Sequence, residues 1–198
     1  MDTGEVIAHA YKWEVTDIRG ETWLYSWALD QHSNPCLFRI RNWPAFFHVG
    51  VPYSQGGQQV PYSLVRGSII NILSEASKRD ISVAPINVQD VCKFPLYYYH
   101  DKECPFIRID FKSIDGMRKA ARILRRDINL GFMSVKCEVH EDNIPFWRKF
   151  LTHIGLRESQ WFRVRAELCD FEDKISRVDE YIVGSEQFTP ISDEEASS

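Results

Sequence analysis

Five basic residues within nine positions are the part of this 198-residue sequence best suited to binding a charged partner. They are Arg118, Lys119, Arg122, Arg125 and Arg126. Spacings of three and four residues place side chains on one face of a helix. Another face of the same helix is apolar, with Met117, Ala121, Leu124 and Ile128. Clustered cations of this kind bind nucleic-acid phosphates, and the alternative is a solvated helix surface opposite an apolar stripe.

The residue patterns of common enzyme active sites are missing from the sequence. A glycine-rich phosphate loop and a Gly-x-Ser-x-Gly turn do not occur. His140-Glu141 begins like a zinc-protease helix, but Ile144 stands where the second histidine is required. The consecutive carboxylates of residues 193–195 are interpreted as a solvated acidic segment, because a two-metal site needs carboxylates from separate elements. We therefore expect no catalytic residue, metal ligand or cofactor in this chain.

The composition is that of a globular protein with an uneven charge distribution. The sequence is 44% hydrophobic and 26% charged, with a net charge of −4. Residues 167–198 contain ten acidic and two basic residues, so residues 1–166 carry +4. A mildly basic body with an acidic tail is typical of a nucleic-acid-binding protein, or of a scaffold that docks a partner through its tail.

Several features favour an intracellular protein without a membrane partner. The five cysteines are widely spaced and lack metal-ligand spacing, so we expect free thiols in a reducing compartment. The N-terminus lacks the basic and apolar regions of a signal peptide. An apolar run long enough to span a membrane does not occur.

Period-two alternation predicts an antiparallel β meander near the N-terminus. Residues 7–15 and 23–27 alternate on either side of a turn at Arg19-Gly20, and residues 36–41 and 45–51 predict two further strands. A helix is expected over residues 63–79. Strand-like composition resumes at residues 83–91 and 95–100. Tyr97, Tyr98 and Tyr99 in the second of these segments fit either an ordinary strand or a base-stacking platform.

Residues 105–166 predict a βαβαβ subdomain. Strands are expected at residues 106–111, 135–139 and 161–166, with Ser113 as the N-cap of the first helix. Asp142 or Asn143 is expected to cap the second helix, Pro145 to lie in its first turn and Gly155 to end it. The α+β fold class predicted here is therefore a meander followed by a ferredoxin-like or RNA-recognition-like subdomain.

These assignments divide the chain into three parts. Residues 1–104 form a β-rich subdomain with one helix, residues 105–166 form the βαβαβ subdomain, and residues 167–198 form an acidic, partly disordered tail. A short strand is expected at residues 181–183. The ribonucleoprotein strand motif of RNA-recognition domains is not supplied by residues 133–140.

Residues 140–162 resemble the segment that closes the N-terminal region of family B DNA polymerases. The family pattern is Tyr-Glu-Ser-Asn-Ile-Pro-Phe-x-Leu-Arg-Phe, followed by Gly-Ile and a Trp. His140, Asp142 and the pair Arg148-Lys149 depart from it. Residues 93–100 and 105–111 look like the same region in polymerases of large DNA viruses, and the resemblance covers about residues 10–166. The matching residues are Glu141, Asn143, Ile144, Pro145, Phe146, Phe150, Gly155 and Trp161.

The resemblance implies a noncatalytic N-terminal region of a replicative family B DNA polymerase. Such a region supports the 3′–5′ exonuclease and polymerase core, in cis or in trans, and contacts single-stranded template DNA. The exonuclease motif Asp-Ile-Glu and the palm motifs do not occur, so Mg²⁺ is expected only in other domains and the chain alone should be inactive. A viral protein of this kind would act in the cytoplasm or nucleus of the infected cell. The matching residues are implied to be structural, with Phe150 and Trp161 in the core and Asn143 and Pro145 at the helix start.

Two alternatives stay open beside the polymerase reading. One is a standalone module that binds single-stranded nucleic acid, motivated by the basic helix and the tyrosine run. The other is a scaffold that docks a partner through the acidic tail.

Overall fold

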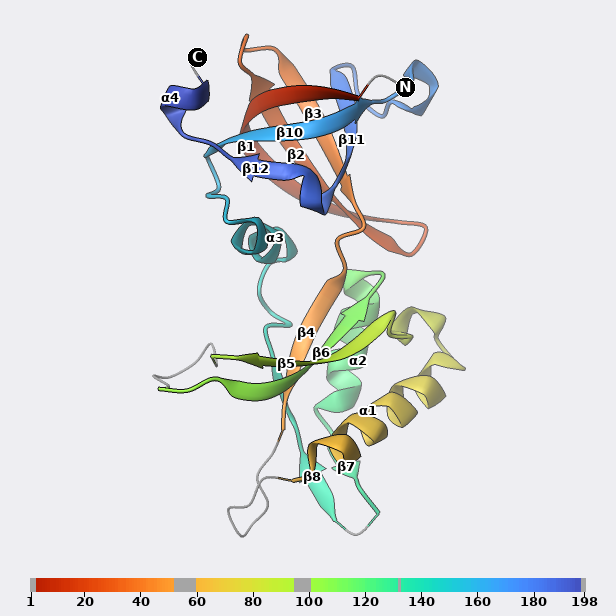
Figure 1. Ribbon diagram of the computed structural model, residues 1–198. Coiled ribbons are helices and arrows are strands. Elements are labelled where there is room, and N and C mark those ends of the chain that lie inside the picture. The colour runs from red at the N-terminus through yellow and green to blue at the C-terminus, as the bar shows by residue number, and fades with distance from the viewer. Residues whose placement is uncertain (1–2, 52–59, 95–100, 132, 197–198) are drawn as a thin grey trace. The chain divides into compact units, whose positions relative to one another are not determined.

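The structure, a computed structural model, describes residues 3–51, 60–94, 101–131 and 133–196 (Figure 1). It confirms the α+β class with antiparallel sheets. The chain divides into two compact units. The barrel unit comprises residues 1–43 and 145–198, and the sheet unit comprises residues 44–144. Each unit is described by itself below.

The barrel unit is built on five strands that close on themselves. In the order β1-β2-β3-β11-β10, each strand pairs with the next, and β10 pairs back onto β1. Strands β3 and β11 run parallel, and the other neighbours are antiparallel. A closed five-stranded barrel of this kind is the architecture of the OB-fold. Its strands are β1 (Thr3–Ile18), β2 (Glu21–Asp30), β3 (Pro35–Arg41), β10 (Trp161–Leu168) and β11 (Asp179–Gly184), and β12 (Phe188–Pro190) pairs with β10.

Strand β1 closes the barrel because it is long and bent. Its first half pairs with β10 and its second half with β2. The register to β2 shifts between Ala10 and Lys12, so Tyr11 is the extra residue of a β-bulge. A bulge bends a strand and increases its twist. The predicted turn at Arg19-Gly20 is confirmed, and both residues have positive φ, at 51° and 80°.

Aromatic rings fill the barrel and join it to helix α3 (Phe146–Ile154). The fully buried Phe38 ring lies 5.4 Å from the ring of Phe162. On α3, the Phe150 ring lies 5.6 Å from Trp43 and is also fully buried. Burying one such ring stabilises the fold by roughly 1.5–3 kcal/mol, so Phe150 helps to hold α3 to the barrel, together with the buried Phe146 and Leu151.

The sheet unit is a four-stranded antiparallel sheet with two helices. The strand order is β5-β6-β4-β9, and the elements follow each other as βαββαβ. This is the ferredoxin-like arrangement that RNA-recognition domains also use. Helices α1 and α2 lie on the same face of the sheet (Figure 1). The elements are β4 (Ala45–Gly50), α1 (Tyr62–Ser77), β5 (Asn87–Lys93), β6 (Cys104–Phe111), α2 (Ile114–Leu124) and β9 (Glu138–His140).

Shorter elements complete the two units. The 3-10 turn η1 (Ile81–Val83) follows α1, and a hairpin of β7 (Asp127–Asn129) and β8 (Ser134–Lys136) precedes β9. In the barrel unit the remaining elements are η2 (Phe171–Asp173), η3 (Ser185–Gln187) and helix α4 (Asp193–Ala196). The predicted strand over residues 95–100, with Tyr97, Tyr98 and Tyr99, lies outside the described residues.

The ferredoxin-like fold predicted for residues 105–166 is formed by residues 45–140 instead. Strand β10 was expected beside β6 and β9, but it belongs to the barrel. Strand β4 was expected in the first meander, but it pairs with β6 and β9. The unit boundaries therefore lie at residues 43/44 and 144/145, not at 104 and 166. Periodicity identifies a strand but does not choose its partner, and here one unit interrupts the other.

The predicted acidic tail is largely part of the barrel. The short strand expected at residues 181–183 is present within β11, which pairs with β3. Val183, Phe188 and Ile191 are buried. Residues up to 191 are therefore part of the barrel. The scaffold hypothesis needs a free acidic tail, and most of the predicted tail is folded.

Helix boundaries follow local chemistry. Ser113 caps α2 as predicted, with its Oγ accepting from the Gly116 amide at 3.1 Å. Helix α3 differs from the prediction, because Pro145 takes the N-cap position and Asp142 binds Arg125 instead of capping. Gly155 ends α3 in the left-handed region, with φ of 71°. Over the described ranges, no helix is long and apolar enough to cross a membrane. All five cysteines are free thiols.

Candidate nucleic-acid interface

Three of the predicted basic residues form an exposed row, two of them on α2 and the third just beyond its C-terminal end. Arg118, Arg122 and Arg126 follow each other at intervals of four residues, and all three are exposed. Four residues of helix rise about 6 Å, so the guanidinium groups of Arg118 and Arg122 are spread along α2. Among the residues that the structure describes, none of the three forms an ion pair. We call these residues the arginine row.

The other two predicted residues are held in ion pairs. The Nζ of Lys119 lies 2.9 Å from Asp80 Oδ2 and 2.7 Å from Asp115 Oδ2. Arg125 Nη2 donates to both carboxylate oxygens of Asp142, at 2.9 Å and 2.7 Å. These pairs anchor α2 to η1 and to the segment after β9. Lys119 and Arg125 are therefore engaged by carboxylates in this structure, whereas no ion pair is described for the arginine row.

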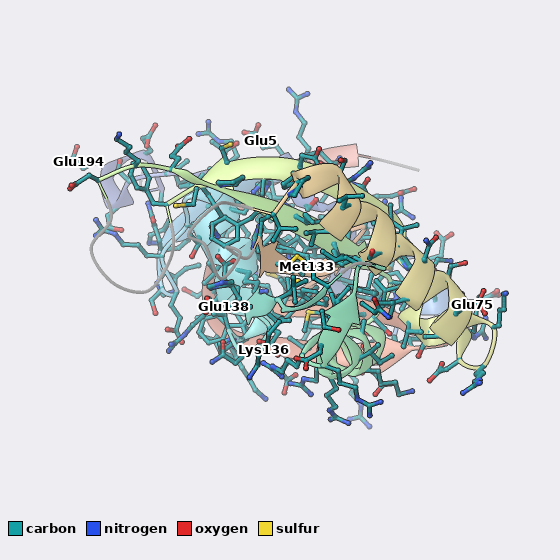
Figure 2. The ribbon with its side chains drawn as sticks, turned by 90° about the horizontal axis from the view of Figure 1, so that it is seen from below. Glu5, Glu75, Met133, Lys136, Glu138 and Glu194 are labelled. Carbon is teal, nitrogen blue, oxygen red and sulfur yellow. The ribbon has the colours of Figure 1, made fainter. Side chains whose placement is uncertain are left out.

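The charge of the two units supports the position of the arginine row. Residues 44–144 contain 13 basic and 11 acidic residues, a net charge of +2. The barrel unit contains 11 basic and 17 acidic residues, a net charge of −6. Lys136 on β8 is another exposed cation of the sheet unit, and exposed Glu138 follows it two residues later (Figure 2). By net charge alone, the sheet unit is therefore a more favourable surface for a polyanion than the barrel unit.

The sheet face opposite α1 and α2 differs from that of an RNA-recognition domain. In such domains aromatic side chains of the sheet stack two or three bases. Here the central strands supply Phe46 and Phe106, but these rings are only 8% and 4% exposed. The guanidinium of Arg108 lies 3.9 Å from the centre of the Phe46 ring. Because these rings are covered, this face is not a ready stacking surface.

A buried ionic cluster lies on that face and includes Glu141 from the polymerase-like pattern. Glu141 is only 8% exposed and has a φ of 66°, a conformation that costs of order 1–3 kcal/mol. Its Oε2 lies 3.2 Å from His48 Nδ1, and its Oε1 contacts Lys93 Nζ. Burial lowers the pKa of Lys93, and the nearby Arg108 lowers it further. Buried charges persist only when paired, so the cluster fixes β9 against β4 and β5.

Sequence reasoning identified Glu141 but missed its partners. His48, Lys93 and Glu141 are far apart in the chain and meet through the pairing of β5, β6, β4 and β9. The sequence signal for them is weak, because isolated His and Lys residues in strands are usually surface residues.

The remaining residues of the polymerase-like pattern take structural positions. Phe146 and Phe150 are buried on α3. Trp161 is partly exposed at the start of β10, with its ring 5.3 Å from His9. Asn143 is exposed in the turn before α3, where the Ile144 amide donates to the Glu141 carbonyl at 3.4 Å. The pattern therefore specifies a turn and a helix.

The barrel unit has an open polar pocket formed by β1, β10, β12 and η3. Oppositely charged residues share it, and Arg163 Nε lies 3.2 Å from Glu5 Oε1. Within the described ranges, no group of three or more His, Cys, Asp or Glu side chains is placed to hold a metal ion. The lining residues are Glu5, Arg163, Arg165, Glu186, Gln187 and Thr189.

The fold is similar to part of a family B DNA polymerase. No protein-family model and no curated protein sequence gives a significant match to the chain. Among solved structures, the chain is similar to the family B DNA polymerase from the hyperthermophilic archaeon Pyrobaculum calidifontis, with a TM-score of 0.64 and 13% identity. The match covers 93% of this chain and 21% of that one, so this chain spans about a fifth of the polymerase's length. The similarity shows a shared fold. The neighbour is archaeal, and the likeness to viral polymerases stays a prediction.

Proposed function

We propose that this chain is a noncatalytic N-terminal region of a family B DNA polymerase that contacts single-stranded template DNA. The observation that carries the proposal is the fold match, which covers 93% of the chain with a TM-score of 0.64. The sequence pattern at residues 141–161 supports it independently. The proposed partners are the exonuclease and polymerase domains, in cis or in trans, together with DNA. Catalysis and its Mg²⁺ ions would belong to those domains.

The arginine row is the proposed contact to the template strand. Three exposed cations of the basic unit, two on α2 and one just after it, can neutralise successive phosphates. Contacts to the phosphate backbone are independent of sequence, as a polymerase that copies any template requires. The ion-paired Lys119 and Arg125 hold the helix in place.

Fluorescence anisotropy with a labelled 20-nucleotide single strand tests this function. We expect a dissociation constant in the micromolar range at 50 mM salt, and weaker binding as salt rises. Replacing the arginine row by alanine removes up to three phosphate contacts and should reduce the salt slope by about 2. A matched control replaces Lys78, Arg79 and Lys102 by alanine, which removes the same charge from other exposed positions of the unit. Failure of the wild type to bind at 50 mM salt contradicts the template contact.

The second candidate, a standalone single-strand-binding module, is favoured by the architecture of the two units. OB-type barrels and RNA-recognition-like sheets both serve as nucleic-acid-binding folds. The candidates differ in what the gene encodes beside this region. The polymerase hypothesis requires an exonuclease strand with the motif Asp-Ile-Glu. That strand should be encoded either directly downstream of this region or in an adjacent gene. If that strand is missing there, the standalone module is the better account.

A further inference from the structure

Strand β2 of the barrel places its largest side chains on the outside. The residues that face the interior are Leu24, Ser26 and Ala28, all fully buried. On the outer face, Trp23 and Trp27 are partly exposed and Leu29 is exposed, whereas Tyr25 is buried. Large apolar side chains normally lie in the core, and groups of them at a surface mark interaction sites.

Neighbouring residues of β1 extend this outer aromatic face. Tyr11, the bulged residue, is 56% exposed. Lys12 lies directly opposite Trp27 in the register of β1 and β2. The indole N–H of Trp27 donates to Glu14 Oε2 at 2.7 Å. This hydrogen bond fixes the Trp27 ring, so its conformational entropy is already lost before a ligand arrives.

The loop between β10 and β11 covers the adjacent part of the barrel surface. Arg39 Nη1 donates to the Asp173 carbonyl at 2.9 Å, and the Ile175 amide donates to Glu180 Oε1 at 2.8 Å. Glu180 is fully buried, and Tyr25 is 7% exposed. OB-type barrels bind oligonucleotides on the face of their second and third strands. Here the loop closes the β3 side of that face and leaves the β1–β2 side open.

We propose that Tyr11, Trp23 and Trp27 form a base-stacking surface for single-stranded nucleic acid, which we call the outer stripe. This inference rests on the proposed function and adds a second contact surface to the arginine row. Trp23 and Trp27 are four residues apart and emerge about 13 Å from each other along the strand. Stacking of one base on an aromatic side chain is worth roughly 5- to 150-fold in affinity and tolerates any sequence.

One end of the outer stripe carries exposed cations together with the exposed carboxylates of Asp17 and Glu21, so it is the aromatic rings that favour a nucleic acid there. Arg19, in the turn between β1 and β2, and Arg41, at the end of β3, are both exposed. Both belong to the end of the barrel that carries Trp23, where the guanidinium of Arg39 also lies 5.5 Å from the Trp23 ring. The net charge of −6 on the whole unit means that stacking, not charge, must supply most of the affinity.

Stacking contacts and phosphate contacts differ in how their loss changes the salt dependence of binding, and the test uses this difference. The double variant Tyr11→Ser/Trp27→Leu should raise the dissociation constant for a labelled 20-nucleotide single strand at least tenfold. The slope of affinity against salt should stay unchanged, because no phosphate contact is removed. The pair Tyr11→Phe/Trp27→Phe keeps the rings and should bind within about threefold of wild type. Leu168→Ser is the matched control, since Leu168 is an exposed apolar residue of the same barrel.

Folding and ligand identity are controlled separately. Tyr11→Ser alone changes an exposed side chain, so it should weaken binding about fivefold without lowering the thermal midpoint. If both Tyr11→Ser and the double variant bind like wild type while the arginine-row variant loses affinity, the outer stripe is overturned and the template contact stands. If wild type does not bind the strand at all, both proposals are overturned. Binding of an oligosaccharide in place of DNA, lost in the double variant, would overturn the ligand assignment.

Discussion

The two units present opposite chemistry at their surfaces. The sheet unit exposes arginines on α2 and covers the rings of Phe46 and Phe106 on its sheet. The barrel unit exposes Tyr11 and part of Trp27, and its net charge is negative. A single-stranded nucleic acid offers phosphates and stackable bases. In our proposals the sheet unit would therefore bind the phosphates and the barrel unit would bind the bases.

Architecture explains the difference between the units. The rings of Phe38 and Phe162 fill the inside of the barrel, so β2 contributes the small Ser26 and Ala28 there and places its large aromatic residues outside. The sheet unit has one face packed by helices, and its other face is closed by the Glu141 cluster and by Arg108. Arg118 and Arg122 are then exposed on the side of α2 that faces away from the sheet.

The largest effect on stability should come from truncating one core ring in each unit, because each truncation should destabilise its own unit. All six Trp residues of the sequence belong to the barrel unit, so Trp fluorescence reports the barrel. Phe162→Ala and Phe111→Ala each remove a fully buried ring and should cost about 3–5 kcal/mol. Phe162→Ala should lower the fluorescence midpoint in denaturant. Phe111→Ala should lower the circular-dichroism transition and barely move fluorescence. Equal shifts of both signals would show that the units unfold as one.

The next largest effect concerns the buried cluster of the sheet unit. Glu141→Gln leaves Lys93 partly buried beside a neutral partner and should destabilise the sheet unit by roughly 2 kcal/mol. The measurement is the circular-dichroism midpoint. Glu138→Gln, an exposed carboxylate nearby, is the control and should change stability by less than about 0.5 kcal/mol. A similar loss in both variants would argue against a special role for the cluster.

A smaller effect is expected from Asp80 in acid. Hydrogen bonds from Ser82 and Lys119 lower the pKa of Asp80 to about 2. A carboxylate with a depressed pKa stabilises the fold above its unfolded pKa, near 4, and loses that stabilisation as pH falls towards 2. The thermal midpoint of the sheet unit should therefore fall between pH 4 and pH 2, and less steeply in Asp80→Asn. The Trp signal of the barrel should show the same pH dependence in both proteins.

The smallest effect is the coupling energy in DNA binding between the arginine row and the outer stripe, which should be close to zero. If the arginine row and the outer stripe act independently, their variants should combine additively in binding free energy, within about 0.5 kcal/mol. The measurement is a double-mutant cycle by anisotropy. A larger coupling would mean that one surface positions the strand for the other.

The sequence predicted most of the described strands, the start of α2 and the end of α3, because those depend on neighbours in the chain. It wrongly extended α2 to Ile128, which lies in β7. Alternation located β2, Ser113 capped α2 and Gly155 ended α3. Alternation alone could not tell which side of β2 faces the interior, since both sets of residues are largely apolar. It also could not place β4 and β10, whose partners are set by long-range pairing.

The candidate site was predicted in part for the same reason. The basic residues of α2 were found by helical spacing. That Lys119 and Arg125 are neutralised depends on Asp80 and Asp142, which come from other elements. The outer stripe was visible only as strand alternation, because its exposure follows from barrel closure and from the loop after β10.

The interruption of the barrel by the sheet unit sets the order in which the nascent chain can fold on the ribosome. The sheet unit is one continuous segment and can fold as soon as it emerges. Strands β1, β2 and β3 emerge earlier, but β10 and β11, which complete the barrel, are synthesised after the sheet unit. During that delay β1 and β3 carry unpaired backbone edges that can join other chains. Assistance by chaperones during synthesis should therefore matter more for the barrel than for the unit inserted into it.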